Sequence, residues 1–151
     1  MTTQAQQKDL VSELNKLVEI NNDRVEGYKK ALKETDDADL KELFKNMVEH
    51  SFGFKNELAD EIMKLGGEPT TGTRTSGKFY RAWMDIRSAL TNKDRKNILS
   101  SCEYGEDAAL ETYEEVIKNT QSSAAFSIIS LQKTALQRDH DKIKALRDMQ
   151  Q

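Results

Sequence analysis

Apolar residues recur at intervals of three and four along most of the chain, which is the period of an amphipathic α-helix. The first such stripe predicts a helix from about residue 8 to 34, and the second predicts one from about 37 to 65. After an interruption, further stripes predict helices from about 92 to 119 and from about 122 to 149. Four amphipathic helices of this length predict an all-α four-helix bundle.

The interruption is rich in glycine and threonine. Four of the seven glycines lie between Gly66 and Gly77, together with the single proline, Pro69, and this composition predicts a loop. A short helix is expected directly after it, from about residue 76 to 90. A connection over 66–91 is long enough to travel along the bundle, which predicts two antiparallel hairpins with a long crossover, the ferritin-like arrangement. A loop that turns straight back is the alternative.

Short polar segments and a glycine pair mark the expected helix ends. Asp36 or Asp37 is placed to cap the second long helix, and Thr91 or Asn92 to cap the third, because their side-chain oxygens can accept from free backbone N–H groups. The Gly66-Gly67 pair is typical of a helix C-terminus.

Composition and charge exclude several classes of protein. The 151 residues predict a single domain spanning 1–151. The 23 basic and 26 acidic residues give a net charge of -3, which provides no polycationic surface for nucleic acid or an anionic membrane. Cys102 has no partner for an internal disulfide, no apolar run is long enough for a membrane span, and the polar start is not a signal peptide. We therefore expect a cytoplasmic protein that binds neither nucleic acid nor a membrane.

Counting from the expected helix ends places several polar side chains near the middle of the bundle. Glu106 lies on an apolar stripe, and a buried carboxylate needs a partner because burying it unpaired is costly. Asn21, Ser51 and Asp139 lie on the stripes of other helices near the same depth. These four residues predict a hydrogen-bonded polar layer in the core that fixes the helix register.

A metal site is the alternative interpretation of this depth. Carboxylate and imidazole ligands from facing helices hold iron or manganese in bundles. The candidate ligands are Glu103, Glu106, His50 and His140. The di-iron arrangement requires a carboxylate three residues before each histidine, but Met47 and Gln137 stand there. The polar layer is therefore the preferred interpretation, and we assign no catalytic residues.

Two further features receive structural interpretations. Cys102 lies on an apolar stripe with no histidine or basic group beside it in the sequence, which favours a small core residue over a reactive thiol. Phe79, Tyr80, Trp83 and Met84 lie on the short helix. We interpret this group as a crossover helix that covers the bundle, and a patch for a partner or ligand is the alternative.

Four segments carry a family likeness. They are Leu65–Pro69, Arg81–Asp85, Cys102–Leu110 and His140–Asp148. In this order, and over nearly the whole chain, they resemble an uncharacterised bacterial family of ferritin-like four-helix bundles, known only as a domain of unknown function. The resemblance implies the fold and a bacterial source but no activity. Within the wider ferritin-like class it implies that Glu103 or Glu106 matches a metal-binding glutamate, and that His140 matches a histidine ligand.

The sequence thus favours a non-catalytic helical bundle that acts through protein association, as a homo-oligomer or with another protein. A stress-related role is expected by analogy with ferritin-like relatives. The alternative is a metal-binding protein with an iron or manganese site in the core, and only that alternative predicts that added metal raises the melting temperature.

Overall fold

The computed structural model describes residues 4–73, 77–92 and 94–150, and the side chains of 77–80, 82 and 83 lie outside the described part. Within these residues the chain is all-α, with five helices and no strands. The helices are α1 (Gln4–Glu34), α2 (Ala38–Lys64), α3 (Gly77–Thr91), α4 (Arg95–Thr120) and α5 (Phe126–Asp148). No helix in the described ranges is both long and apolar enough to cross a membrane.

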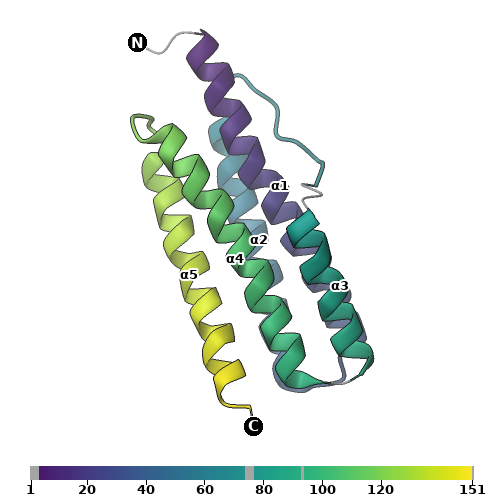
Figure 1. Cartoon of the computed structure of the whole chain (residues 1–151). Coiled ribbons are helices and arrows are strands. Elements are labelled where there is room, and N and C mark those ends of the chain that lie inside the picture. The colour runs from purple at the N-terminus through teal and green to yellow at the C-terminus, as the bar shows by residue number, and fades with distance from the viewer. Residues whose placement is uncertain (1–3, 74–76, 93, 151) are drawn as a thin grey trace.

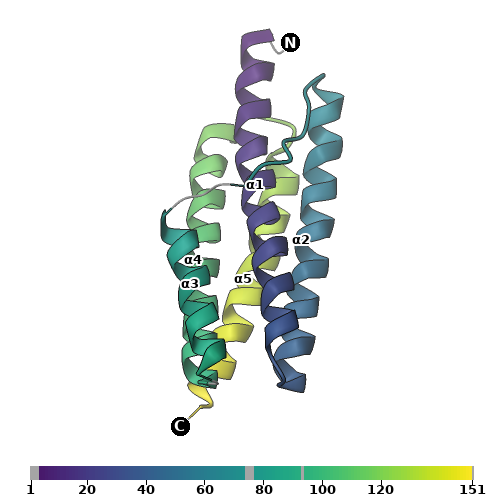
Figure 2. The same cartoon turned by 90° about the vertical axis from the view of Figure 1, so that its right-hand side faces the viewer.

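The four long helices form a bundle, and α3 lies outside it against α1 and α4 (Figures 1 and 2). Residues 65–73 pass from the end of α2 back along the bundle, α3 runs on in that direction, and α4 begins at the end of the bundle where α2 begins. Arg95 at the start of α4 binds Asp37 just before α2, with 2.5 Å between Nη1 and Oδ2. The helices α2 and α4 therefore run in the same direction, and each is antiparallel to the helix joined to it by a short turn.

The end of α2 confirms the expected glycine signal. Gly66 has a φ of 79°, in the left-handed region that glycine adopts without strain. The N–H of Gly66 donates to the carbonyl of Met63 at 3.0 Å, and the N–H of Gly67 donates to that of Ile62 at 3.0 Å. These two bonds satisfy carbonyl groups of the last helical turn, so the helix stops where the glycine pair stands.

One expected helix start is confirmed, that of α2, and two need correction, those of α4 and α5. Asp37 does cap α2, since its side chain accepts from the N–H of Asp39. At the start of α4, however, the capping residue is Asp94 rather than Thr91 or Asn92, and its Oδ1 accepts from the N–H of Asn97 at 3.2 Å. Thr91 is instead the last residue of α3. The last helix begins at 126 rather than at about 122, because residues 121–125 form turns.

Among the described residues, the apolar core consists of two clusters. One includes Leu17 and Ile62 and is completed by residues of α4 and α5. The other includes Phe44, Leu99 and Ile143. Of the expected stripe on the short helix, Ile86 and Leu90 are buried in the second cluster. The prediction that Phe79, Tyr80 and Trp83 cover the bundle falls on side chains outside the described part, and Met84 is exposed.

Candidate functional site

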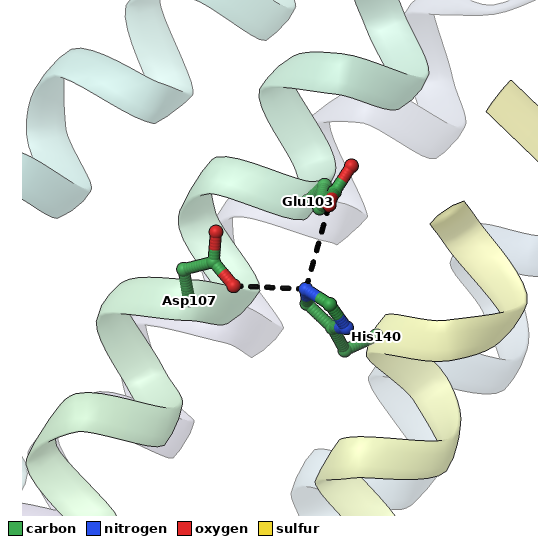
Figure 3. A group of neighbouring side chains, drawn as sticks. All are labelled: Glu103, Asp107 and His140. Atoms are coloured by element: carbon green, nitrogen blue, oxygen red, sulfur yellow. Dashed lines mark ion pairs between the residues drawn. The ribbon is translucent and has the colours of Figure 1, made fainter. Parts of the chain in front are cut away.

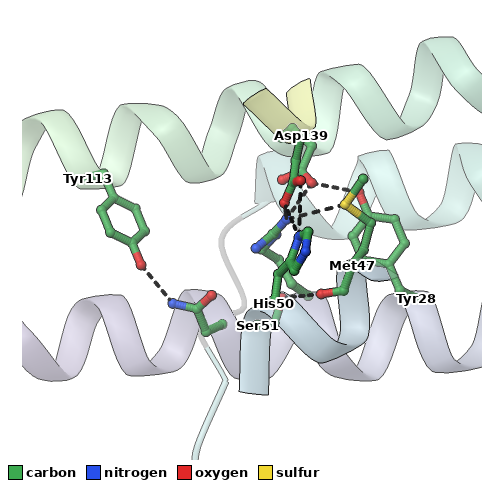
Figure 4. Close-up of polar contacts among 9 residues, drawn as sticks. Tyr28, Met47, His50, Ser51, Tyr113 and Asp139 are labelled. Carbon is green, nitrogen blue, oxygen red and sulfur yellow. Dashed lines mark hydrogen bonds and ion pairs between the residues drawn. The ribbon is translucent and has the colours of Figure 1, made fainter. Parts of the chain in front are cut away.

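A buried arginine stands at the centre of the bundle. Arg24 on α1 is 0% exposed. Its Nη2 donates to Oε1 of Glu106 on α4 at 2.6 Å and to Oδ2 of Asp139 on α5 at 3.4 Å. The same nitrogen lies 3.8 Å from the sulfur of Met47 on α2 (Figure 4). One guanidinium group therefore contacts all three of the other long helices.

Two further side chains complete what we call the Arg24 cluster, which consists of Arg24, Tyr28, Glu106, Asp139 and His50. The hydroxyl of Tyr28 donates to Oε1 of Glu106 at 3.2 Å. Nδ1 of His50 on α2 lies 2.9 Å from Oδ2 of Asp139 (Figure 4). The His50 side chain is 48% exposed, whereas that of Asp139 is 8% exposed. The cluster thus extends from solvent at His50 to the fully buried Arg24.

The electrostatics of the cluster keep Arg24 charged. Burial by itself lowers the pKa of Arg24, but Glu106, Tyr28 and Asp139 more than offset this, so its pKa is raised. Burial raises the pKa of Glu106 above its ordinary value, because the attraction of Arg24 does not fully offset the loss of water. Burial also raises the pKa of Tyr28, so that its phenol stays protonated and can donate. The cluster therefore pairs a permanent cation with two carboxyl groups.

Not every polar atom of the cluster is satisfied. Nε and Nη1 of Arg24 and Oε2 of Glu106 are buried and have no hydrogen-bond partner among the described residues. Such groups are costly in a dry interior. The net contribution of these ion pairs to stability is therefore smaller than their number implies.

A second, uncharged network links the same four helices. Nδ2 of Asn21 donates to the hydroxyl of Tyr113 at 2.9 Å (Figure 4). This hydroxyl donates in turn to Oε1 of Gln132 at 2.7 Å. Nε2 of Gln132 then donates to the backbone carbonyl of Phe54 at 3.1 Å. Burial raises the pKa of Tyr113, which keeps its hydroxyl protonated. Together the two networks form polar contacts across the middle of the bundle.

All four residues of the expected polar layer are buried: Asn21, Ser51, Glu106 and Asp139. The structure divides them. Glu106 and Asp139 meet at Arg24, and Asn21 joins Tyr113. Ser51 bonds within its own helix, since its hydroxyl donates to the carbonyl of Met47 at 2.8 Å.

Sequence reasoning did not identify Arg24, Tyr113 or Gln132 as members of these networks. A signal for Arg24 was present, because it lies three residues after Asn21 and four before Tyr28 on the same helix. Residues at these spacings share one helix face. An arginine between two core positions of this kind is a candidate partner for a buried carboxylate.

A different cluster lies between α4 and α5 (Figure 3). Nε2 of His140 on α5 lies 2.8 Å from Oδ1 of Asp107 and 3.6 Å from Oε1 of Glu103, both on α4. One ligand atom from each of these residues lies within 4.8 Å of the others. The side chains of His140 and Glu103 are mostly buried, whereas that of Asp107 is 47% exposed.

Two neighbours complete what we call the His140 cluster, which consists of Glu103, Asp107, His140, Asp141 and Arg147. Nδ1 of His140 lies 3.1 Å from Oδ1 of Asp141. Arg147 pairs through Nη1 with Oε2 of Glu103. The hydrogen bond from His140 lowers the pKa of Asp141. Asp107 was not among the expected ligands, although it lies four residues after Glu103 and so shares its helix face.

The structure divides the four candidate metal ligands between the two clusters. Glu106 and His50 belong to the Arg24 cluster, whereas Glu103 and His140 belong to the His140 cluster. In the core, the guanidinium of Arg24 stands against Glu106, and a permanent cation there repels a metal ion. The core residues therefore do not fit an iron or manganese centre of the kind that the ferritin-like resemblance implies.

The single cysteine lies beside the core networks. Cys102 is 0% exposed. Burial raises the pKa of its thiol, and Glu106 raises it further. Because the thiolate is the reactive form of cysteine, this environment favours the unreactive thiol form of Cys102.

Comparison with known proteins identifies a family but no activity. Residues 9–119 match a family described as "Domain of unknown function (DUF2383)". The match includes Arg24 and Glu106 and ends within the last turn of α4, so that α5 with Asp139 and His140 lies beyond it. Of the four segments that carry the family likeness, the first three lie within the match. No curated protein matches the chain.

Proposed function

The chain belongs to the DUF2383 family, and we propose that it is a non-catalytic helical bundle that acts through association of copies of itself. The observation that carries the proposal is the Arg24 cluster. The interior groups best suited to chemistry, Glu106 and Asp139, are engaged with Arg24 and hold helices together. Because these carboxyl groups pair with Arg24 inside the bundle, we expect the protein to act through contacts made by its exposed side chains.

The exposed surface offers apolar contacts for association. Leu131 on α5 is 71% exposed, and Met63 in the last turn of α2 is 56% exposed. Large apolar side chains are the residues whose burial contributes most to association. We take Leu131, the more exposed of these two, as the first contact to test.

The ferritin-like arrangement is part of the same proposal. It is supported by the parallel course of α2 and α4 and by the connection through α3. The bacterial source and the stress-related role rest on the resemblance of the four segments, and the cytoplasmic location rests on composition, including the single cysteine. An iron or manganese site in the core is not favoured, because Arg24 takes the place that a metal ion would need.

Sedimentation equilibrium over a wide range of protein concentrations tests the proposal. We expect the apparent mass of the wild-type chain to rise above that of one chain, and Leu131→Glu to reduce this rise. Gln137→Glu is the matched control, because Gln137 is also exposed on α5 and lies about 120° around the helix axis from Leu131. A mass of one chain at every concentration, with Trp83 fluorescence independent of concentration, would contradict self-association.

A further inference from the structure

We propose that Glu103, Asp107 and His140 bind one divalent transition-metal ion at the surface between α4 and α5. Nε2 of His140 lies 2.8 Å from the Asp107 oxygen and 3.6 Å from the Glu103 oxygen (Figure 3). Ligand atoms around a tetrahedral ion with bonds of about 2.0–2.1 Å lie about 3.3 Å apart. The two observed distances bracket this value, and one ligand atom from each of the three residues lies within 4.8 Å of the others.

The positions of the three residues on their helices support the site. Glu103 and Asp107 are four residues apart on α4, so both project from one face of that helix. His140 projects toward them from α5 (Figure 3). Ligands held by two packed helices are more precisely placed than ligands on a loop. Because the side chain of Asp107 is 47% exposed, water or a ligand from another molecule can complete the coordination.

The surrounding residues orient the ligands as metal sites require. Nδ1 of His140 faces Oδ1 of Asp141 at 3.1 Å, and metal-binding histidines usually bond through their second nitrogen to such a carboxylate. Nε2 of Gln137 donates to the same Asp141 oxygen at 3.0 Å and holds it in place. Arg147 pairs with Oε2 of Glu103, while Oε1 faces His140. The arrangement thus leaves one oxygen of Glu103 directed at the proposed ion.

Charge balance favours a cation at this cluster and indicates its class. Within the His140 cluster three carboxylates, those of Glu103, Asp107 and Asp141, face one guanidinium, that of Arg147. Just outside the cluster, Asp148 also pairs with Arg147, and the charge of Lys144 acts on Asp141. The excess of negative charge attracts a divalent ion. An imidazole ligand favours Zn²⁺ and similar transition metals over Mg²⁺ or Ca²⁺, which prefer oxygen ligands alone. This site is separate from the core, and the proposed self-association does not depend on it.

Titration calorimetry with Zn²⁺ on the untagged full-length chain tests the proposal. We expect one ion per chain, and binding at least tenfold weaker in His140→Ala and in Asp107→Asn. His50→Ala is the matched control because it removes the chain's other histidine, and its Zn²⁺ binding should equal that of the wild type. Circular dichroism checks that each variant is folded, and Asp107→Asn alters a half-exposed side chain whose loss the fold should tolerate.

Three results would overturn the site. One is the absence of saturable Zn²⁺ binding, and another is equal binding by wild type, His140→Ala and Asp107→Asn. The third is displacement of Zn²⁺ by an equal concentration of Mg²⁺, which would indicate that oxygen atoms alone bind the ion and that His140 is not a ligand. Co²⁺ provides an independent readout, since its visible absorption should appear in the wild type and be lost in His140→Ala. None of these results depends on the sedimentation experiment.

Discussion

The Arg24 and His140 clusters are built from the same residue types but differ in burial. Each contains an arginine, a histidine, a glutamate of α4 and at least one aspartate. In the core, Nη2 of Arg24 bonds to carboxylates of two helices. At the surface, Arg147 pairs with Oε2 of Glu103, and Nε2 of His140 faces Oε1 of Glu103 and Oδ1 of Asp107. We infer that burial decides the difference. The buried carboxylates of the Arg24 cluster are held by Arg24, whereas the less buried carboxylates of the His140 cluster can bind an ion.

The physical basis of the difference is the cost of removing charge from water. A carboxylate in the core must be neutralised by a fixed partner, because no solvent can compensate for it. At the surface, water stabilises the charges, and an ion pair adds little to stability. The two glutamates, Glu103 and Glu106, are three residues apart on α4, which is less than one helical turn. This small difference in position places Glu106 in the core and Glu103 at the surface between α4 and α5.

The largest expected effect is the loss of the core cation. Arg24→Met keeps a long apolar side chain but leaves Glu106 and Asp139 without their common partner. We expect it to lower the free energy of unfolding by about 3–5 kcal/mol, as when one partner of a buried ion pair is removed. Urea unfolding followed by circular dichroism measures the change.

The same substitution at the surface is the control for that effect. Arg147→Met removes the arginine of the His140 cluster, whose side chain is 25% exposed. We expect a much smaller loss of stability, because solvent can take the place of the guanidinium. Equal losses in the two variants would show that burial does not distinguish the clusters.

A smaller effect concerns pH, and its sign should differ between the clusters. In the folded chain the pKa of Glu106 is raised above 4.5, so the folded state holds this proton more tightly than the unfolded state. Its contribution to stability is therefore greatest at or below pH 4.5 and decreases as the pH rises toward the folded pKa. The pKa of Asp141 is lowered from 3.8, so its contribution is present above pH 3.8 and is lost as the pH falls through the folded pKa.

Two isosteric variants measure these opposite signs. The unfolding free energy of the wild type minus that of Glu106→Gln should decrease as the pH rises above 4.5. The corresponding difference for Asp141→Asn should increase as the pH rises toward and past 3.8. Parallel pH dependences in the two variants would contradict the assignment of one group to a dry environment and the other to solvent.

The helices were largely predictable from the sequence because each buries a regular stripe. The glycine pair after α2 and the cap at Asp37 also followed from local chemistry. The start of α5 did not, since residues 121–125 combine Gln, Ser and Ala without a strong turn signal. The helix begins about one turn later than expected, and the register of α5 against α4 could not be derived from the sequence.

The candidate site was predictable only in part, because periodicity within one helix indicates which residues are buried but not which residues of other helices they contact. The burial of Asn21, Glu106 and Asp139 followed from their positions on apolar stripes. The role of Arg24 did not follow, because a long charged side chain at a stripe position usually reaches back to solvent. The pairing of Asp107 with His140 depends on the register of α5, which periodicity within one helix does not determine.

A double-mutant cycle between Arg24 and Glu106 tests most directly the central claim that their buried ion pair organises the core. The cycle compares Arg24→Met, Glu106→Gln and the double variant by urea unfolding. We predict a coupling free energy of about 2–3 kcal/mol, with the double variant more stable than the sum of the single losses implies. Additive losses, within about 0.5 kcal/mol, would contradict the claim.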